Sequence, residues 1–337
     1  MKQHFVAIDI GGSKISILAR RVGSDRDIFG EKLKTPAKSG VEAVLRLLDQ
    51  QIDKLAGGPA GLKALGVAVP GHVDDAGHVL WAGNLDGWVD LPLRQILEER
   101  YRAPVYVERD ANCAALGEKW IGAAKGMNDF VFLALGTGVG AGLFLDGRLY
   151  RGAHFAAGEV GNMRLFSGKP AEDGGPAVSE IVGKRAIKRD AERATGRRMS
   201  AAEALERASA KRRLRRATRK VVEYLSASVM AISSVLDPEA ILFGGGTSEA
   251  GEALLGRVRK RVAPLFGTRL MLAGLRTDSQ LYGALWGAQN VAARRSSDAG
   301  RSAPLNLAEP LSKRSIRVKR SARSVAQRAL SHRRRKR

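Results

Sequence analysis

A short segment occurs twice in this chain and limits the folds that the chain can adopt. Residues 5–20 read FVAIDIGGSKISILAR, and residues 130–145 read FVFLALGTGVGAGLFL. In both, an apolar run that begins with Phe-Val leads into a glycine-rich turn, and a second apolar run follows the turn. The two strand–turn–strand units lie about 125 residues apart, which predicts a chain built from two related α/β halves.

Helices and strands are expected to alternate along the rest of the chain. Apolar periodicity predicts helices over 40–56, from Asp110 onwards, over 178–195, 200–236 and 249–260, and from Gln280 to about Arg294. Further strands are expected over 65–71, 103–108 and 241–246. Strands that alternate with helices are typical of α/β folds, and a length of 337 residues suggests about two domains.

The charge of the chain is concentrated in two segments. The formal net charge is +23, and most of the excess Lys and Arg lies in residues 184–220 and 294–337. Basic clusters of this kind can bind nucleic acid, polyphosphate or another polyanion, but they can equally be a solvated helix face and a disordered tail. We expect residues 296–337 to be such a tail, because Ser, Pro and Arg dominate there and apolar periodicity is weak.

The remaining composition excludes several classes of protein. Cys113 is the only cysteine, which excludes an internal disulfide framework and any metal site built from a cysteine cluster. The amino-terminal segment has no long apolar region that ends at a small-residue cleavage site. No apolar run approaches the roughly 20 residues of a transmembrane helix. We therefore expect a globular cytoplasmic protein without a membrane partner.

The two glycine turns are candidates for phosphate binding. GTGVGAG has the spacing of a dinucleotide-binding fingerprint, but that fingerprint requires a following helix, and GLFLDG here is typical of a strand and a hairpin turn. We therefore interpret both turns as hairpins whose backbone N–H groups bind phosphate, because glycine lets the backbone approach a ligand closely. Asp9 could hold Mg²⁺ through water, while Ser13 and Lys14 contact phosphate oxygens. Ordinary tight hairpins are the alternative, and a third glycine turn at 244–246 favours the phosphate interpretation.

One acidic residue lies where an apolar run meets a helix-like segment. The stretch VERDANCAALGE, residues 107–118, places Asp110 at this point. Asp is a preferred helix N-cap, so the local pattern by itself favours capping. A residue at the carboxyl end of a strand in an open α/β sheet also faces the crevice in which such folds bind ligands. The local sequence therefore leaves two roles open for Asp110, a helix cap and a catalytic base.

Seven segments follow one another in the order in which ROK-family sugar kinases carry them. They are DIGGSK (9–14), VPGHVD (69–74), NLDGW (84–88), ERDANCAALGE (108–118), LGTGVGAGLFLDGRLYRGAHFAAGEVGNM (135–163), LDPEAILFGGG (236–246) and YGALWGA (282–288). The chain resembles this family over about residues 4–292, and within the family it is similar to bacterial glucokinases. The resemblance implies the actin-like (ribonuclease H-like) ATPase and sugar kinase fold, an α/β fold of two domains with an interdomain cleft.

The resemblance also implies domain bounds and residue roles. A small amino-terminal domain would comprise residues 1–113, completed by the helix near 280–294, and a large domain would comprise residues 114–280. The positions that match ATP-binding motifs are Asp9, Gly11, Gly12, Ser13, Lys14, Gly136, Thr137, Gly138, Gly244, Gly245 and Gly246. Those that match sugar-contacting positions are Asn84, Asp110, Glu159 and Glu180, and Gly71 is expected to line the same pocket. Asp110 matches the catalytic base.

The chain departs from the family pattern at three places. Arg109 occupies the position before the catalytic Asp, where Asn is usual, and Asn162 occupies a position where His is usual. The segment 171–180 retains Glu180 but lacks the cysteine cluster with which many members bind zinc, so zinc is not expected. Asn162 could still hydrogen-bond a sugar hydroxyl. Arg109 is expected to lower the pKa of Asp110 through its charge.

The motifs and the resemblance together predict an ATP-dependent hexose kinase. It would transfer the γ-phosphate of ATP, with Mg²⁺, to the 6-hydroxyl of glucose as a glucokinase of glycolysis, with Asp110 as general base. Polyphosphate as donor, or another hexose such as fructose or N-acetylmannosamine, is the alternative within this class. A catalytically weak sugar-sensing protein with a polyanion-binding tail is the alternative of another class. The family suggests a homodimer, and because the phosphate motif begins at Asp9, we do not expect the DNA-binding domain that precedes this part in the family's repressors.

Overall fold

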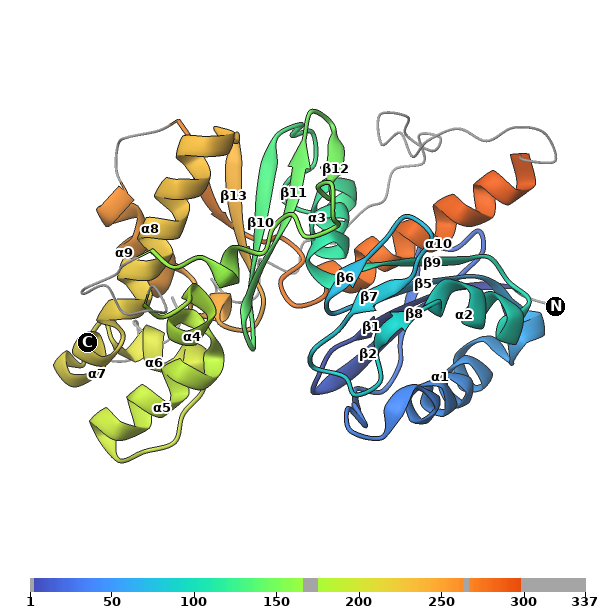
Figure 1. Ribbon diagram of the computed structural model, residues 1–337, viewed down its shortest axis with the longest axis horizontal. Helices are drawn as coiled ribbons and strands as arrows, with labels where there is room; N and C mark the ends of the chain where they lie inside the picture. Colours follow the sequence, from blue (N-terminus) through green and yellow to red (C-terminus); the bar gives the residue numbers. More distant parts are fainter. Residues whose placement is uncertain (1–2, 166–174, 263–266, 298–337) are drawn as a thin grey trace, which may run out of the picture. The chain divides into compact units, whose positions relative to one another are not determined.

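The computed structural model describes residues 3–165, 175–262 and 267–297. These residues form two mixed sheets covered by helices, together with a small third sheet (Figure 1). The α/β fold class predicted from the sequence is confirmed. The tail predicted over 296–337 lies outside the described residues, apart from the two positions that end the last helix.

The first sheet has the strand order β3-β2-β1-β5-β9. Its members are β1 (His4–Ile10), β2 (Lys14–Arg21), β3 (Asp27–Phe29), β5 (Leu62–Val69) and β9 (Val105–Arg109), and β4 (Leu33–Lys34) pairs with β2. β1 and β2 form the antiparallel hairpin that residues 5–20 predict, with Ile10 opposite Ile15. β1, β5 and β9 are parallel, so their carboxyl ends meet at one edge of the sheet.

Helix α1 (Gly40–Ala56) covers this sheet and has the bounds that the sequence predicts. Its apolar residues Val44, Leu48 and Ile52 recur at helical spacing and are almost fully buried. They join strand residues such as Ile8 in one apolar cluster, to which α2 (Leu93–Tyr101) contributes further side chains. A short turn of 3₁₀ helix, η1 (Pro59–Gly61), connects α1 to β5. Burial of the apolar residues of α1, rather than helix propensity alone, stabilises the helix on the sheet.

The second sheet repeats this plan in the order β12-β11-β10-β13-β14. Its strands are β10 (Phe130–Leu135), β11 (Val139–Leu145), β12 (Arg148–Tyr150), β13 (Ala240–Gly244) and β14 (Arg269–Leu272). β10 and β11 form the hairpin that residues 130–145 predict, and β13 lies parallel to β10. The turn at Asp146 and Gly147 has positive φ at both residues, which confirms the predicted hairpin turn. The sequence did not predict β14.

Helices α3 (Asp110–Ile121) and α10 (Ser279–Ser297) pack closely against each other (Figure 1). Two glycines permit this approach. A Cβ at Gly117 would lie 2.3 Å from the carbonyl oxygen of Ser279, and one at Gly283 would lie 1.7 Å from that of Cys113. α10 also packs on β1, β5 and β9, whereas α3 contacts β10 and β11. The helix predicted near 280–294 therefore packs on the sheet formed by the start of the chain.

The helix predicted over 178–195 is interrupted at Gly183. It consists of α4 (Val178–Val182) and α5 (Lys184–Thr195). A Cβ at Gly183 would lie 2.5 Å from the carbonyl oxygen of Ser179 and 2.6 Å from that of Thr137. The break lets the chain pass close to the second glycine turn.

The prediction of one long helix over 200–236 was wrong. The segment forms α6 (Ala201–Arg207), α7 (Arg212–Ala217) and α8 (Arg219–Leu236). Leu205 and Leu214 are both buried in the same apolar cluster, although in a continuous helix these side chains would point in roughly opposite directions. The chain therefore turns between them, and the Arg-rich face of α7 stays in solvent.

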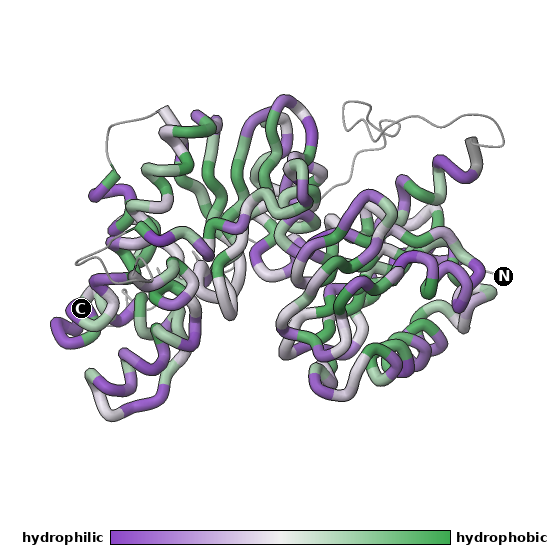
Figure 2. The backbone as a smooth tube through the Cα atoms, in the orientation of Figure 1, coloured by the Kyte–Doolittle hydropathy of each residue, from purple (hydrophilic) through white to green (hydrophobic). Residues whose placement is uncertain are grey.

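Smaller elements complete the described structure. A three-stranded sheet, not predicted, comprises β6 (His72–Val73), β7 (Val79–Trp81) and β8 (Val89–Leu91). Two turns of 3₁₀ helix are η2 (Val160–Asn162) and η3 (Ser248–Ala250), and α9 (Glu252–Val262) begins three residues later than predicted. One apolar cluster joins buried side chains of residues 6–107, and another joins those of residues 131–262. Hydrophobic colouring follows the strands of both large sheets, whereas α5 and α7 are largely hydrophilic (Figure 2).

Candidate active site

The carboxyl edge of the first sheet brings together residues that are far apart in the sequence. Asp9 of β1 pairs with Ala68 of β5, which in turn pairs with Glu108 of β9. Asp110 follows β9 as the first residue of α3. Parallel pairing therefore places Asp9 and Asp110 at the same edge, where the charge of Asp110 acts on the carboxyl of Asp9.

Asp110 lies in the first turn of α3. Its Oδ1 accepts a hydrogen bond of 2.6 Å from the backbone N–H of Ala111, and Arg109 is the residue that precedes the helix. The positive end of the helix dipole stabilises a carboxylate at this position. Among the described residues, no hydrogen-bond donor reaches its Oδ2. The predicted role of Asp110 as the helix cap was therefore wrong, because Arg109 is the N-cap and Asp110 is the first residue of the helix. One carboxylate oxygen of Asp110 stays available, as a catalytic base requires.

The pKa of Asp110 differs in direction from our expectation. Burial raises it, the positive charge of Arg109 lowers it, and the charge of Glu159 raises it again. The expected influence of Arg109 is present, but the loss of hydration outweighs it, so the net pKa lies above the usual value of an Asp. A raised pKa makes the ionised carboxylate a stronger base.

Asp9 is the more strongly perturbed carboxyl of the pair. Burial and the charge of Asp110 raise the pKa of Asp9 to about 7, whereas Lys14 lowers it and Asp278 raises it. Asp278, which directly precedes α10, is not among the predicted site residues, because only the return of α10 to the first sheet reveals its position. A cation beside Asp9 would relieve the repulsion among these carboxylates. Oxygen donors of this kind suit Mg²⁺.

A metal ion at Asp9 would need ligands besides protein side chains. Within residues 3–165, 175–262 and 267–297, no group of three or more His, Cys, Asp and Glu side chains is placed to hold a metal. Mg²⁺ commonly binds through one or two carboxylates, water and substrate phosphates. A site at Asp9 fits that pattern. Residues 171–174, on which the prediction about zinc partly rests, lie outside the described residues.

The first glycine turn lies beside a residue that was predicted to contact sugar. The backbone N–H of Gly11 donates a 2.9 Å hydrogen bond to the carbonyl oxygen of Lys14, which closes the turn. A Cβ at Gly12 would lie 2.9 Å from the Cβ of Asn84. The side chains of Ser13 and Lys14 are exposed. Asn84 and the first turn therefore border the same space.

The other two glycine turns lie next to each other at the carboxyl edge of the second sheet. Ala134 of β10 pairs with Gly244 of β13, so the turns at 136–138 and 244–246 are neighbours. Gly245 has a φ of 82°, and a Cβ there would lie 2.6 Å from the carbonyl oxygen that ends β10. Both facts require glycine at this position. The second sheet thus presents two backbone turns at one place.

Two glycines of these turns face open space. A Cβ at Gly136 or at Gly246 would meet no atom within 4 Å, and neither residue has positive φ. Packing of the described chain therefore does not require glycine there. Because these glycines have no side chain, a ligand can come close to the backbone N–H groups, as phosphate binding needs. Thr137, between the two glycines of its turn, is partly buried.

Lys184, at the start of α5, is bonded to the turn at 136–138 and lies within electrostatic reach of Lys14 in the first glycine turn. Its backbone N–H donates a 2.9 Å hydrogen bond to the carbonyl oxygen of Gly136. Burial and the charges of Lys188, Lys14 and Arg185 lower its pKa. Lys14 belongs to the first glycine turn, so lysines from two distant parts of the chain face the same region. Mutually repelling cations next to glycine turns suit a phosphate ligand. Lys184 was predicted only as part of the basic segment 184–220 and not as a site residue.

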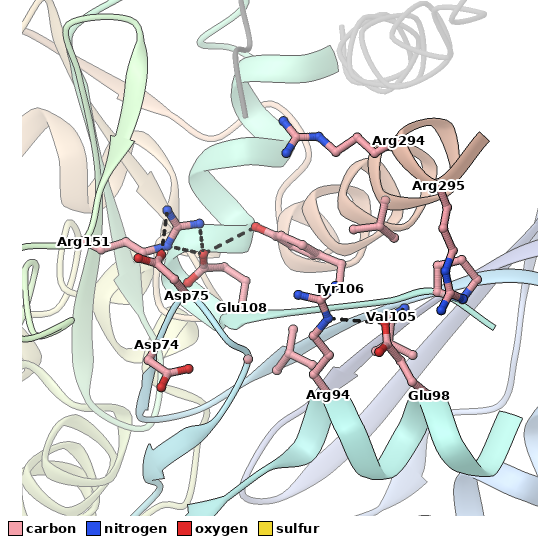
Figure 3. Close-up of a pocket in the computed structure, with 14 residues that line it drawn as sticks. Asp74, Asp75, Arg94, Glu98, Val105, Tyr106, Glu108, Arg151, Arg294 and Arg295 are labelled. Carbon is pink, nitrogen blue, oxygen red and sulfur yellow. Dashed lines mark hydrogen bonds and ion pairs between the residues drawn. The ribbon is translucent and has the colours of Figure 1, made fainter. Parts of the chain in front are cut away.

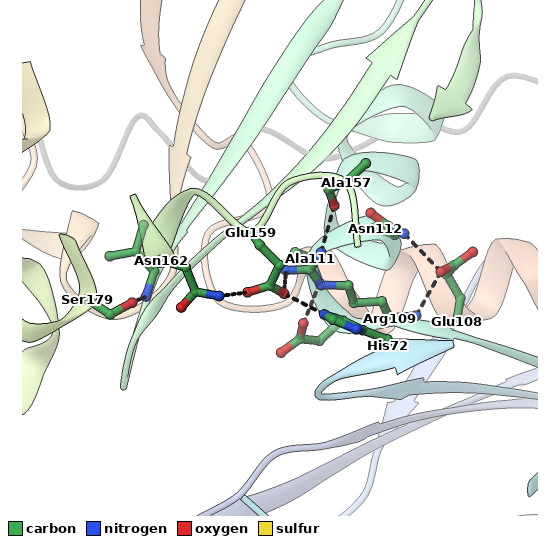
Figure 4. A network of polar contacts seen from close by, with 11 residues as sticks. His72, Glu108, Arg109, Ala111, Asn112, Ala157, Glu159, Asn162 and Ser179 are labelled. Carbon is green, nitrogen blue, oxygen red and sulfur yellow. Dashed lines mark hydrogen bonds and ion pairs between the residues drawn. The ribbon is translucent and has the colours of Figure 1, made fainter. Parts of the chain in front are cut away.

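Glu159 is the centre of a polar network that includes two predicted residues (Figure 4). Its Oε1 lies 2.7 Å from Nη2 of Arg109 and 3.3 Å from Nε2 of His72. Its Oε2 accepts a 3.1 Å hydrogen bond from Nδ2 of Asn162. Arg109 also donates through Nη1 to the carbonyl oxygen of Ala157 at 2.8 Å. The charge of Glu159 acts on Asp110, so this network lies close to the candidate base.

Gly71 and Glu180 have structural contacts of their own. Gly71 has a φ of 92°, and a Cβ there would lie 1.9 Å from the carbonyl oxygen of Trp81, so the turn after β5 requires glycine. Oε2 of Glu180 accepts a 3.0 Å hydrogen bond from the backbone N–H of Ala177 at the start of α4. Among the contacts of the described residues, none joins Glu180 to Glu159. The structure therefore does not bring Glu180 into the network of Figure 4.

Comparison with known proteins assigns the fold to a family. The model of the ROK family matches residues 5–289. The chain belongs to the ROK family. The predicted resemblance is thereby confirmed, and with it the two-domain sugar kinase fold class.

This ROK family member has relatives with different names. A xylose repressor of Caldicellulosiruptor bescii is 31% identical over 277 residues, which cover 76% of this chain and 69% of the repressor. A glucokinase of Halalkalibacterium halodurans is 29% identical over 313 residues, 84% of this chain and 94% of the glucokinase. The crystal structure of a ROK family glucokinase from Streptomyces griseus, in complex with glucose and AMPPNP, has a TM-score of 0.70 at 28% identity and covers 85% of this chain and 99% of its own.

A buried carboxylate adjacent to the site organises the other side of β9 in this ROK family member. Glu108 is 2% exposed, and its Oε2 accepts bonds from Nε of Arg151 at 2.8 Å and from Nη2 at 2.6 Å. Its Oε1 accepts from Nδ2 of Asn112 at 3.0 Å and from the backbone N–H of the next residue at 2.8 Å. Glu108 and Arg151 border a cavity of about 400 Å³ that none of the predicted site residues lines (Figure 3). The sequence signal that could have revealed Glu108 was the presence of an acidic residue within the apolar segment 103–108.

A second buried carboxylate, Glu118 of α3, secures the segment that carries Asp278. It is fully buried and accepts hydrogen bonds from the backbone N–H groups of Ala123, Gly274 and Leu275 at 2.7 to 2.9 Å. The hydroxyl of Ser279 donates a fourth bond of 2.8 Å. The start of α10 is thereby tied to α3.

Among the described helices, none is both long and apolar enough to cross a membrane.

Proposed function

We propose that this ROK family member is a hexose kinase that transfers the γ-phosphoryl group of ATP to the 6-hydroxyl of glucose. The observation that carries the proposal is a group of three carboxylates, in which the charge of Asp110 acts on Asp9 and that of Glu159 acts on Asp110. Lys14 of the first glycine turn acts on Asp9 and on Lys184, whose backbone N–H is bonded to Gly136 of the second turn. Glucokinases are among its relatives, and the Streptomyces griseus enzyme was crystallised with glucose and AMPPNP, which supports this acceptor and this donor.

Asp110 is the general base of the proposed reaction. Its Oδ1 is held by the N–H of Ala111, while Oδ2 accepts the proton of the attacking hydroxyl. The hydroxyl oxygen bonds to the γ-phosphorus as the bond from that phosphorus to the β–γ bridging oxygen breaks, and ADP leaves. Burial raises the pKa of Asp110, which increases its basicity, while the positive charge of Arg109 opposes the rise. Removing a general base typically costs about 10²–10⁴-fold in rate.

The glycine turns and two lysines would bind the donor. Backbone N–H groups of the turns at 11–13, 136–138 and 244–246 would approach the nucleotide and its phosphates. Lys14 and Lys184 would stabilise the charge that develops on the transferred group. Asp9 would hold Mg²⁺ through water, with Asp278 nearby, and the ion supplies charge neutralisation to the phosphates when bound.

The sugar would be bound by groups that surround Asp110. Asn84 lies against the first glycine turn, and Glu159 and Asn162 are joined by a hydrogen bond. Amide and carboxylate groups can accept and donate bonds to several hydroxyls at once. Glu180 is proposed as a further contact. We also propose that residues 1–113 with the helix near 280–294, and residues 114–280, act as the two domains between which the sugar binds.

Polyphosphate is a second candidate donor, favoured by the cations that continue from the glycine turns along α5. Lys184 lies at Gly136, Lys188 and Arg185 act on it electrostatically, and α5 packs on the Arg-rich α7. A chain of phosphates longer than that of ATP could follow these charges. Lys188→Gln is expected to raise the KM for polyphosphate several-fold and to leave that for ATP unchanged. No turnover with polyphosphate would remove this candidate.

A panel of sugars and donors tests the proposed function. The purified protein is given glucose, fructose, mannose or N-acetylmannosamine with ATP·Mg²⁺ or polyphosphate, and the sugar phosphate is measured. We expect turnover of glucose with ATP, and a loss of about 10²–10⁴-fold in kcat for Asp110→Asn. Asp25→Asn, a change at an exposed carboxylate, is the matched control and is expected to keep full activity.

Two outcomes would contradict the proposal. Robust turnover by Asp110→Asn would refute the assignment of the base. Absence of turnover by the native protein on every sugar, together with measurable sugar binding, would favour a sugar-sensing role. A relative named xylose repressor at 31% identity makes that second outcome a concrete alternative.

A further inference from the structure

Arg109 is an almost fully buried cation beside the candidate base. The residue is 4% exposed, although arginine is seldom buried unless it is paired. Its Nη2 lies 2.7 Å from Oε1 of Glu159, and its Nη1 donates to the carbonyl oxygen of Ala157 at 2.8 Å. The two terminal nitrogens of one rigid guanidinium therefore fix two points of the segment that carries Glu159.

The strand opposite Arg109 leaves space for its guanidinium. A Cβ at Gly140 of β11 would lie 3.3 Å from Nη2 of Arg109, so a side chain there would crowd the guanidinium. Arg109 comes from β9 of the first sheet, whereas Gly140 belongs to the second. The contacts of the guanidinium with Glu159 and Ala157, together with this close approach to Gly140, define the position of the side chain.

These contacts use part of the hydrogen-bonding capacity of the Glu159 carboxylate. Arg109 and His72 both reach Oε1, and Asn162 donates to Oε2 (Figure 4). Each carboxylate oxygen keeps lone pairs for further donors, such as sugar hydroxyls. The direction of those lone pairs is set by the groups that hold the carboxylate, and Arg109 makes the shortest of these contacts.

Arg109 also sets the charge around Asp110. Asp9 from β1, Glu159 from the segment after β12 and the buried thiol of Cys113 on α3 all lie in the electrostatic surroundings of Asp110. Arg109 is the cation that acts on Asp110 within this group. Without it, several carboxylates would face one another at a partly buried site, which is unfavourable.

We propose that Arg109 is a positioning residue for the kinase reaction, whose guanidinium orients Glu159 toward the sugar and whose positive charge balances the carboxylates of Asp110 and Glu159. This inference rests on the proposed function. It assigns a role to the residue at which this chain departs from the Asn usual in its family. The geometric part requires the forked guanidinium, whereas the electrostatic part requires only a positive charge, so different substitutions separate them.

Two substitutions at position 109 test the two parts. Arg109→Lys keeps the charge but cannot reach both Glu159 and Ala157, so we expect at least about tenfold weaker glucose affinity with an unchanged acidic limb of the kcat–pH profile. Arg109→Gln loses both, so the acidic limb is also expected to move about one unit to higher pH, because the pKa of Asp110 rises. Arg148→Gln, at an exposed arginine of β12, is the matched control.

Glucose affinity is measured by calorimetry without a nucleotide, and kcat is measured from pH 5 to 9. An Arg109→Gln variant with native glucose affinity and a native pH profile would overturn the inference, as would equal shifts of the acidic limb in both variants. Native KM for ATP and native thermal unfolding in the Lys variant separate positioning from loss of fold. If the native protein binds glucose without turning it over, the proposed function fails, while the affinity series still decides the role of Arg109. If it binds no sugar at all, both fail.

Discussion

Replacing Asp9 with Asn is expected to stabilise the protein above neutral pH and to lower its catalytic activity. Burial and the charge of Asp110 raise the pKa of Asp9 to about 7, against the opposing charge of Lys14. A carboxyl with a raised pKa binds its proton more tightly in the folded than in the unfolded state, so the folded state loses stability as pH rises. Asn has nearly the same shape and no charge, so the variant lacks this cost.

The size of the effect follows from the pKa of Asp9. A rise from 3.8 to about 7 corresponds to about 4 kcal/mol of unfolding free energy once Asp9 is ionised in both states. The cost is absent below about pH 4, where the carboxyl is protonated in both states, and it is complete above about pH 7. Because Asp9 is only partly buried, solvent screens part of the effect. The advantage of Asp9→Asn over the native protein is expected to grow by roughly 2 kcal/mol between pH 5 and pH 8.

Urea unfolding of both proteins at pH 5 and pH 8 measures this advantage directly. Comparing the variant with the native protein at each pH removes the contribution of the other titrating groups. Asp25→Asn, at an exposed carboxylate, is the control and is expected to show no such pH dependence. An advantage that is equal at both pH values, or larger at pH 5, would refute the reasoning. The kcat of Asp9→Asn is expected to fall at least about 100-fold, since the charge proposed to hold Mg²⁺ is lost.

Three further predictions concern packing and charge. Glu118→Gln is expected to lower the unfolding free energy by about 2–4 kcal/mol in urea titrations, because a fully buried carboxylate that accepts four hydrogen bonds is lost; Glu249→Gln, at an exposed carboxylate, is the control. Gly283→Ala is expected to cost at least about 2 kcal/mol, because its Cβ would lie 1.7 Å from a carbonyl oxygen of α3, and an unchanged melting temperature would argue against this packing. Lys184→Gln is expected to raise the KM for ATP about tenfold in steady-state assays without changing that for glucose, and a selective effect on glucose would contradict its placement at the donor.

The local elements near the site could be predicted because their signals are contained in short segments. The hairpin turns after β1 and β10 follow from glycines placed between apolar runs, and the bounds of α1 follow from an uninterrupted apolar stripe. Asp110 could be placed at the end of β9 and the start of α3 for the same reason. The parallel strands then bring Asp9 and Asp110 to one edge, which the α/β alternation already implies.

The long basic segment shows where local periodicity fails. Helix propensity is high throughout 200–236, and no Pro or Gly interrupts it, so one helix was the natural prediction. The break before α7 depends on the burial of both Leu205 and Leu214 in one cluster, and that cluster includes strands from distant parts of the chain. Burial of the two leucines outweighs the local helix propensity, because it contributes more free energy than a few additional helical residues do.

The α/β class, the three glycine turns, the candidate base and the family could all be inferred from the amino-acid sequence. Each of these depends on residue types at short spacing or on an ordered set of motifs. The contacts of Arg109, the hydrogen bonds that satisfy the buried carboxylates of Glu108 and Glu118, and the approach of Asp278 and Lys184 to the site all depend on the folded chain. The tertiary structure also decided the sign of the pKa shift of Asp110, because the loss of hydration on burial outweighs a neighbouring charge that the sequence already shows. Burial and distance are set by contacts between segments far apart in the chain, so they cannot be inferred from residues that are adjacent in the sequence.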